Sequence, residues 1–124
     1  WGMRPVIHSQ VVDIPHEMTT TAFEIPGYRI TANKGVVRGV VVRSRSVFGT
    51  IGAGLQTIFG GNISLFTELA ERTRQQAFDT MLIQAHLAGA HAVIGIRYDA
   101  TELMQGVTEV LCYGTAVTLE RSTG

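Results

Sequence analysis

The side chains in this chain that could bind a metal or attack a substrate are few and widely spaced. Apart from scattered carboxylates, they are one cysteine and four histidines: His8, His16, His86, His91 and Cys112. A metal centre needs several donors that converge on one point, and no two of these residues stand at a spacing that metal sites commonly use. His86 and His91 flank Gly89, so they do not share a helical face as the histidines of an HExxH motif do. The pattern favours polar residues at a helix end over a metal site within one chain.

Cys112 lies among Val110, Leu111 and Tyr113, which favours a buried structural thiol over a reactive one. No Cys/His nucleophile pair, acid/base pair or cofactor fingerprint is visible in the sequence. We therefore expect no catalytic residues, no enzymatic activity and no organic cofactor. A single cysteine cannot form an intramolecular disulfide, which favours a reducing compartment and predicts a cytoplasmic protein.

The glycine-rich segment 48–62, FGTIGAGLQTIFGGN, could in principle cradle a phosphate with its backbone N–H groups. It lacks the GK[ST] ending of a P-loop and the spacing of a dinucleotide fingerprint, so we interpret it as a packed connection or a subunit contact. It could enclose a short helical turn at residues 55–59. Arg38, Arg43 and Arg45 cluster just before this segment and could collect an anion between subunits, but solvated or ion-paired arginines are the simpler interpretation.

Composition limits the class of protein. The chain has 124 residues, 45% of them hydrophobic and 16% charged, which fits one folded domain with a modest core. Lys plus Arg equals Asp plus Glu at 10 each, so no excess charge attracts nucleic acid or an acidic membrane. No apolar run approaches the roughly 20 residues that span a bilayer. We expect neither nucleic acid nor membrane as a partner, and the small ligand is not identified by the sequence.

One long amphipathic helix followed closely by a strand dominates the pattern. Ser64 is the predicted N-cap, and Gly89 is the predicted stop in the left-handed conformation. Small and apolar residues recur at three-, four- and seven-residue spacing between them: Leu69, Ala70, Thr73, Ala77, Met81, Leu82, Ala85 and Ala88. Because this stripe is rich in alanine, we expect the helix to lie close against a sheet.

Three long strands are predicted around this helix, over residues 35–47, 92–99 and 107–119. Gly35 and Gly39 are the expected points of a bulge or a close approach in the first of them. A shorter β segment is predicted at residues 28–31, a turn at 101–106, and an arm at 1–17 that could add an edge strand near Val11. In the strand at 107–119, Val110, Cys112, Gly114 and Ala116 are expected on one face, and Val107, Leu111, Tyr113, Val117 and Leu119 on the other.

The predicted fold class is α+β, with a β-α-β-β subunit in which one long helix lies on one face of a three-stranded sheet. All three strands carry hydrophobic residues on both faces, so one helix leaves a second apolar face without cover. A soluble monomer seldom exposes more than a few hundred Å² of such surface, and we therefore expect a homo-oligomer.

Five separated blocks resemble the YbjQ family of small bacterial and archaeal proteins. They are GVVRG (35–39), FGGN (59–62), ELAERTRQQAFDTM (68–81), AGAHAVIGIRYD (88–99) and GTAV (114–117). The resemblance spans residues 18–120 and leaves 1–17 as an N-terminal extension and 121–124 as a C-terminal tail. It implies a dodecin-like subunit that assembles into a ring, typically a homopentamer, with pairs of rings able to stack.

The family is commonly labelled as heavy-metal-binding, yet it has no established activity. Two functions from different classes stay open for this chain. The first is a non-catalytic, ring-forming binding or scaffold protein. The second is a protein or enzyme that binds a divalent or heavy metal at a site formed between subunits, for which the candidate ligands are His91, Asp99, Glu102, Glu109 and Cys112.

Overall fold

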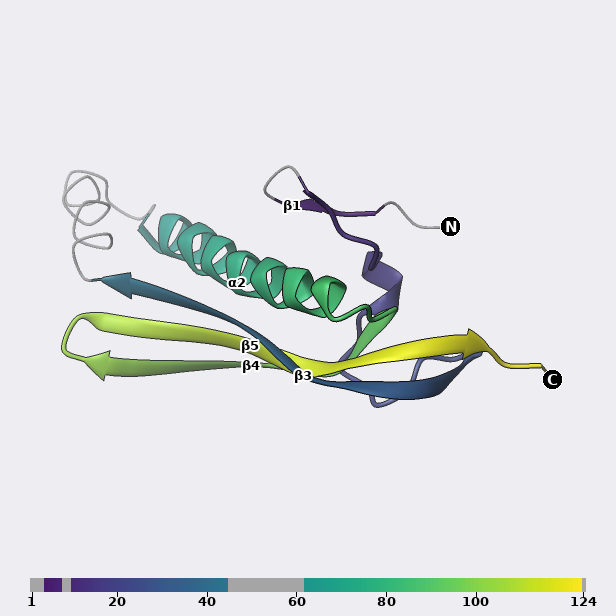
Figure 1. The fold of residues 1–124 in the computed structure, drawn as a ribbon. Helices are drawn as coiled ribbons and strands as arrows, with labels where there is room; N and C mark the ends of the chain where they lie inside the picture. Colours follow the sequence, from purple (N-terminus) through teal and green to yellow (C-terminus); the bar gives the residue numbers. More distant parts are fainter. Residues whose placement is uncertain (1–3, 8–9, 45–61, 124) are drawn as a thin grey trace.

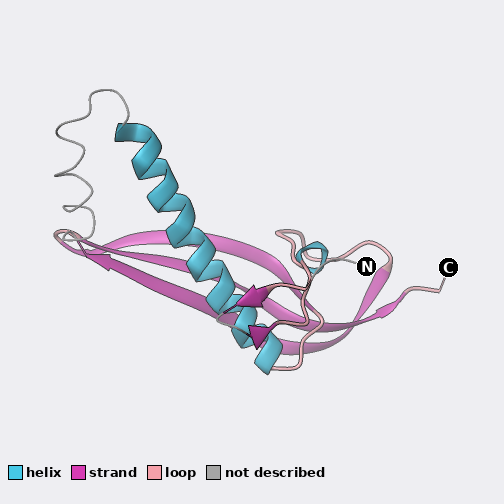
Figure 2. Cartoon of the chain, turned by 90° about the horizontal axis from the view of Figure 1, so that it is seen from above, coloured by secondary structure: helices cyan, strands magenta, loops and turns pink. Residues whose placement is uncertain are grey.

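The computed structural model describes residues 4–7, 10–44 and 62–123. The long helix α2 (Asn62–Leu87) lies over an antiparallel sheet of β3 (Tyr28–Ser44), β4 (Ala92–Met104) and β5 (Val107–Arg121), with β5 between the other two (Figure 1). A small hairpin of β1 (Val6–Ile7) and β2 (Gln10–Val11) lies on the helix near its C-terminal end, and a short 3-10 helix η1 (His16–Met18) follows it (Figure 2). The predicted α+β class and β-α-β-β order are confirmed.

The helix follows its predicted pattern closely. Leu69, Thr73, Ala77, Met81, Leu82 and Ala85 are buried, while Ala70 and Ala88 at the margins of the stripe are exposed. Gly89 has φ +79° just after the last helical residue, as the predicted stop requires. The helix begins at Asn62, so Ser64 lies within it and the prediction of Ser64 as N-cap was wrong.

The strands are longer than the sequence pattern predicted. The predicted segment at 28–31 and the described part of the segment at 35–47 form one strand, β3. They join because β5 pairs with β3 along its whole length, through register shifts between Ile30 and Ala32 and between Asn33 and Gly35. Gly35 has φ +101°, and its N–H donates to Oδ1 of Asn33 at 2.7 Å, so it forms the predicted bulge. The predicted end of β4 at Asp99 was too early, because β4 continues to pair with β5 as far as Met104.

The N-terminal arm packs into the core instead of adding an edge strand to the main sheet. Its strands pair with each other, Val6 with Val11 and Ile7 with Gln10. Val12 and Ile14 are fully buried in the cluster that contains Met81, Leu82 and Ala85 of the helix. The division of the chain at residues 17 and 18 stays a prediction.

The segment after the arm covers part of the sheet face that the helix leaves free. Ile25 packs there with Ala92, Ile94 and Val117, and Met18, Tyr28 and Leu119 surround this second cluster. The backbone of residues 19–22 also joins the sheet edge, through a parallel bridge from Thr19 to Val93 and a hydrogen bond of 2.7 Å from the Gly95 N–H to the Ala22 carbonyl. The second face therefore has its own small hydrophobic core at this end.

Three predictions fall on residues 45–61, which lie outside the described residues. They are the end of the strand predicted at 35–47, the packed connection with its helical turn at 55–59, and the third arginine of the cluster, Arg45. Of the helices in the described ranges, none has the length and hydropathy to cross a bilayer. The cytoplasmic location stays a prediction.

Candidate functional site

Cys112 lies in the core between helix and sheet, as predicted. Its side chain is fully buried, and its Sγ lies 3.7 Å from Sδ of Met81 on α2. The Tyr98 hydroxyl, opposite Cys112 on β4, donates a hydrogen bond to the sulfur. Burial raises the pKa of Cys112 to about 11, and the bond from Tyr98 opposes part of that rise. The thiol is therefore protonated at neutral pH and lacks the charge that a nucleophile needs.

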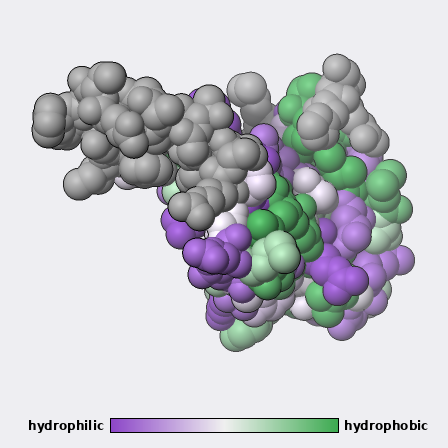
Figure 3. All heavy atoms as spheres, turned by 90° about the vertical axis from the view of Figure 1, so that its left-hand side faces the viewer, coloured by the Kyte–Doolittle hydropathy of each residue, from purple (hydrophilic) through white to green (hydrophobic). Residues whose placement is uncertain are grey.

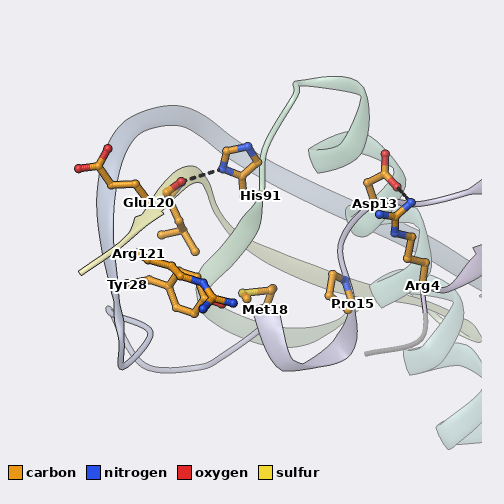
Figure 4. A pocket seen from close by; sticks show the side chains of 9 residues that line it. Arg4, Asp13, Pro15, Met18, Tyr28, His91, Glu120 and Arg121 are labelled. Atoms are coloured by element: carbon orange, nitrogen blue, oxygen red, sulfur yellow. Dashed lines mark hydrogen bonds and ion pairs between the residues drawn. The ribbon is translucent and has the colours of Figure 1, made fainter. Parts of the chain in front are cut away.

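His91, the second metal candidate, caps the end of β5. The backbone N–H of Leu119 donates to Nδ1 of His91 at 2.9 Å, and the Leu119 carbonyl oxygen lies 3.2 Å from the same nitrogen (Figure 4). A backbone N–H can only donate, so Nδ1 is the acceptor, and the proton of the neutral ring is assigned to Nε2. A metal ligand needs an unshared lone pair on nitrogen. In this arrangement the lone pair on Nδ1 accepts the hydrogen bond from the Leu119 N–H, and Nε2 carries the proton. The hydrogen bond from Leu119 would have to break before His91 could offer a free lone pair to a metal.

The three candidate carboxylates lie on β4 and β5, in the halves of these strands next to the turn that joins them. Asp99 and Glu109 are on the sheet face away from the helix, in neighbouring cross-strand pairs with Leu111 and Thr101. Glu102 points to the opposite face by alternation, where its Oε1 lies 3.4 Å from the N–H of Gly106. Across residues 4–7, 10–44 and 62–123, no three His, Cys, Asp or Glu side chains come together as a metal site. A site that unites these residues between subunits stays a prediction.

The sheet face opposite the helix has an open half that no described residue covers. Its rungs carry Val36, Val40 and Val42 from β3 beside Leu111 and Tyr113 from β5. Val36 is 72% exposed and Val40 is 45% exposed, although β3 is paired with β5 at both positions. Figure 3 looks along the sheet from the end where β3 finishes and shows hydrophobic surface among hydrophilic side chains. This open half is the surface that the sequence predicted to be buried by assembly.

A pocket of about 310 Å³ opens at the other end of the molecule, where the arm meets the ends of β3 and β5 (Figure 4). The arm, the turn after α2 and the sheet each supply one wall. Its lining residues are Arg4, Asp13, Pro15, Met18, Tyr28, His91, Leu119, Glu120 and Arg121. This volume is at the lower end of the roughly 300–1,000 Å³ that is usual for small-molecule sites.

The charges around the pocket are neutralised with one exception. Arg4 pairs with Asp13 at 3.1 Å, and Glu120 pairs with Arg29. Tyr28 and Arg121 face each other on the terminal rung of the β3–β5 ladder. Figure 4 shows the Arg121 side chain beside the Tyr28 ring with its guanidinium next to Met18, while the Glu120 carboxylate points away. Arg121 has no ion-pair partner within the described part of the chain, so the pocket combines one free cation with an apolar floor.

The sequence did not indicate this pocket. It placed Arg121 in a C-terminal tail and the arm outside the domain, whereas Arg121 is the last residue of β5 and the arm forms a wall. Only the strand register brings Tyr28 and Arg121 together, and no local pattern encodes that register over so long a separation. The single available signal was the pair of hydrophobic residues Val12 and Ile14, whose alternation indicates a buried segment.

Two relatives of known sequence match most of the chain. A protein of Solibacter usitatus (strain Ellin6076) is 65% identical over 104 residues, which cover 84% of this chain and 93% of that protein. One of Paraburkholderia phymatum is 62% identical over 109 residues, which cover 88% and 98% respectively. Both carry the name "UPF0145 protein", which states no activity.

A solved structure shares the fold. It is the crystal structure of a protein of unknown function from Pediococcus pentosaceus, described as a member of the DUF74 family. It has a TM-score of 0.54 and 19% identity to this chain, and the alignment covers 82% of this chain and 96% of that one. A family model described as "Putative heavy-metal-binding" matches residues 17–120. The chain therefore belongs to the YbjQ family, together with the UPF0145 proteins that it resembles.

Proposed function

We propose that this protein is a non-catalytic binding module that works as a ring of identical subunits, with a homopentamer as the expected ring. The observation that carries the proposal is the open half of the sheet, where hydrophobic side chains lie on well-paired strands with no described residue over them. Removing such a face from water is the main favourable term in most protein association. A second copy of this chain is the proposed occupant.

Charges on the same face support a copy of the chain as the partner. Arg38 lies on β3 at one margin of the open half, Asp99 lies on β4 at the other margin, and Glu109 lies on the central strand β5 between them. Opposite charges at the two margins of one hydrophobic face allow Arg38 of one subunit to pair with an acidic residue of the next. A head-to-tail contact of this kind closes into a ring when the rotation between subunits permits it.

Native mass spectrometry and light scattering test the assembly. The wild-type protein is expected to give one species with the mass of a pentamer of 13.4 kDa chains. Val40→Glu should lower the mass, because it places a charge in the middle of the face. Val11→Glu is the matched control, since Val11 is a 52% exposed valine on the arm, and it should leave the mass unchanged. A wild-type monomer at micromolar concentration would overturn the proposal.

The alternative is a heavy-metal-binding protein whose site forms between subunits, and one observation favours it. Asp99 and Glu109 lie on adjacent rungs of the proposed contact face, so a ring would bring carboxylates of neighbours together. Elemental analysis of untagged, dialysed protein decides between the two. Stoichiometric metal that is lost in an Asp99→Asn, Glu109→Gln double variant would support the alternative, whereas metal-free protein of unchanged mass supports the binding module.

A further inference from the structure

We infer that the pocket between the arm and the ends of β3 and β5 binds a small organic carboxylate with an apolar body. This inference deepens the proposed binding function by naming a ligand class. It rests on a different part of the molecule from the assembly, because the pocket lies at the end of the sheet remote from the open half.

The carboxylate assignment follows from the charges. Arg121 is the one pocket cation without a partner in the described ranges, and Arg4 is already paired with Asp13 at 3.1 Å. A guanidinium presents two parallel N–H groups that match the two oxygens of a carboxylate. A phosphate dianion is commonly held by several cationic donors, whereas Arg4 is paired with Asp13 and leaves Arg121 as the one unpaired arginine of the lining. One free guanidinium fits a ligand with a single negative charge.

The apolar body follows from the floor and walls. Met18 and Tyr28 lie beside the guanidinium (Figure 4), and Leu119 also lines the pocket. All three pack against the hydrophobic cluster of the second sheet face. Pro15 adds a further apolar wall on the arm side. The flexible thioether of Met18 can adapt to chains of different shape. A ligand whose chain lies on Met18 and Leu119 would keep its carboxylate beside Arg121.

The position of His91 makes this pocket a preformed one. Its ring forms part of the wall and is held by the Leu119 N–H at 2.9 Å, so it needs no rearrangement when a ligand enters. The arm is fixed by the fully buried Val12 and Ile14, and the Asp13 N–H between them lies 3.2 Å from Nδ1 of His86. Preformed walls reduce the entropy lost on binding.

Isothermal titration calorimetry with hexanoate tests the inference, with acetate, hexanol and inorganic phosphate as comparison probes. Hexanoate is expected to bind one molecule per chain and to bind more tightly than the other three. Arg121→Gln should weaken hexanoate at least about tenfold, since it removes the charge-assisted bonds. Arg72→Gln, which removes an exposed arginine of the helix outside the pocket, should change the affinity less than about twofold.

Each outcome decides the matter. Equal affinities for phosphate and hexanoate, equal affinities for hexanol and hexanoate, unchanged binding by Arg121→Gln, or absence of hexanoate binding would each overturn the ligand class. The native mass of Arg121→Gln should equal that of the wild type. If hexanoate does not bind, the native mass of the protein is still that of the ring. If the protein is a monomer, hexanoate binding is unaffected.

Discussion

Gly39 of β3 lies backbone to backbone against Ala77 of the helix. A Cβ atom at position 39 would stand 1.9 Å from the Ala77 carbonyl oxygen and 2.7 Å from the Met81 amide nitrogen. Beside it, the N–H of Arg38 donates to Oε1 of Gln84 at 2.8 Å, so the helix also satisfies a backbone group at the edge of the sheet. Together these contacts set the distance between the two layers of the fold.

Gly39→Ala should destabilise the protein by about 3 kcal/mol or more, because a whole helix backbone must move to admit one methyl group. Gly114→Ala is the matched comparison, since its nearest obstacle is a side-chain atom, Cγ1 of Val93 at 2.8 Å. Urea unfolding of the two variants should rank Gly39→Ala as the less stable. The reverse order would show that the helix shifts more easily than the side chains of β4.

Alkaline pH should unfold the protein partly through Cys112. Burial raises its folded pKa to about 11 from 9.0, so its contribution to stability is complete below pH 9 and is lost as the pH rises to about 11. Burial and the neighbouring Cys112 also raise the pKa of Tyr98 to about 12, which extends the loss upward. Between pH 8 and 11 the wild type should lose more unfolding free energy than Cys112→Ala, by about 2 kcal/mol. Equal losses would contradict the burial argument.

Arg97 holds the segment before β3 against the sheet. Its Nη1 donates to the Thr21 carbonyl oxygen at 2.8 Å, and its guanidinium lies 5.6 Å from the centre of the Phe23 ring. Arg97→Gln should speed amide hydrogen exchange at Gly95 about fivefold, which corresponds to about 1 kcal/mol. Exchange at the fully buried Cys112 should not change. If both positions accelerate equally, Arg97 supports the whole fold and not this segment alone.

The sequence predicted the parts of the fold that depend on local periodicity. The stripe from Leu69 to Ala85, the stop at Gly89 and the two faces of β5 are each determined by neighbouring residues. Strand lengths were underestimated because residues 32–34 and 100–104 have no strong β pattern. They join the sheet only because β5 supplies partners along its whole length, from Val107 to Arg121.

The candidate sites were less predictable. Residue types alone suggested His91 and Cys112 as metal ligands, but the bond from Leu119 and the complete burial of the thiol depend on tertiary packing. The cover that Ile25 gives to one end of the second sheet face was also not encoded locally. Consequently the surface predicted for assembly is smaller than expected, since it includes only the open half.

Ile14 tests whether the arm is a structural part of the domain. Its side chain is fully buried, so Ile14→Ala should cost about 2–5 kcal/mol through lost burial and the cavity that remains. Val11→Ala changes a 52% exposed residue of the same arm and should cost less than about 0.5 kcal/mol. Urea unfolding measures both. Because the arm also forms one wall of the pocket, Ile14→Ala should weaken hexanoate binding while Val11→Ala should not. Equal stability of the two variants would mean that the domain folds without the arm, and the pocket would then have to form from the sheet alone.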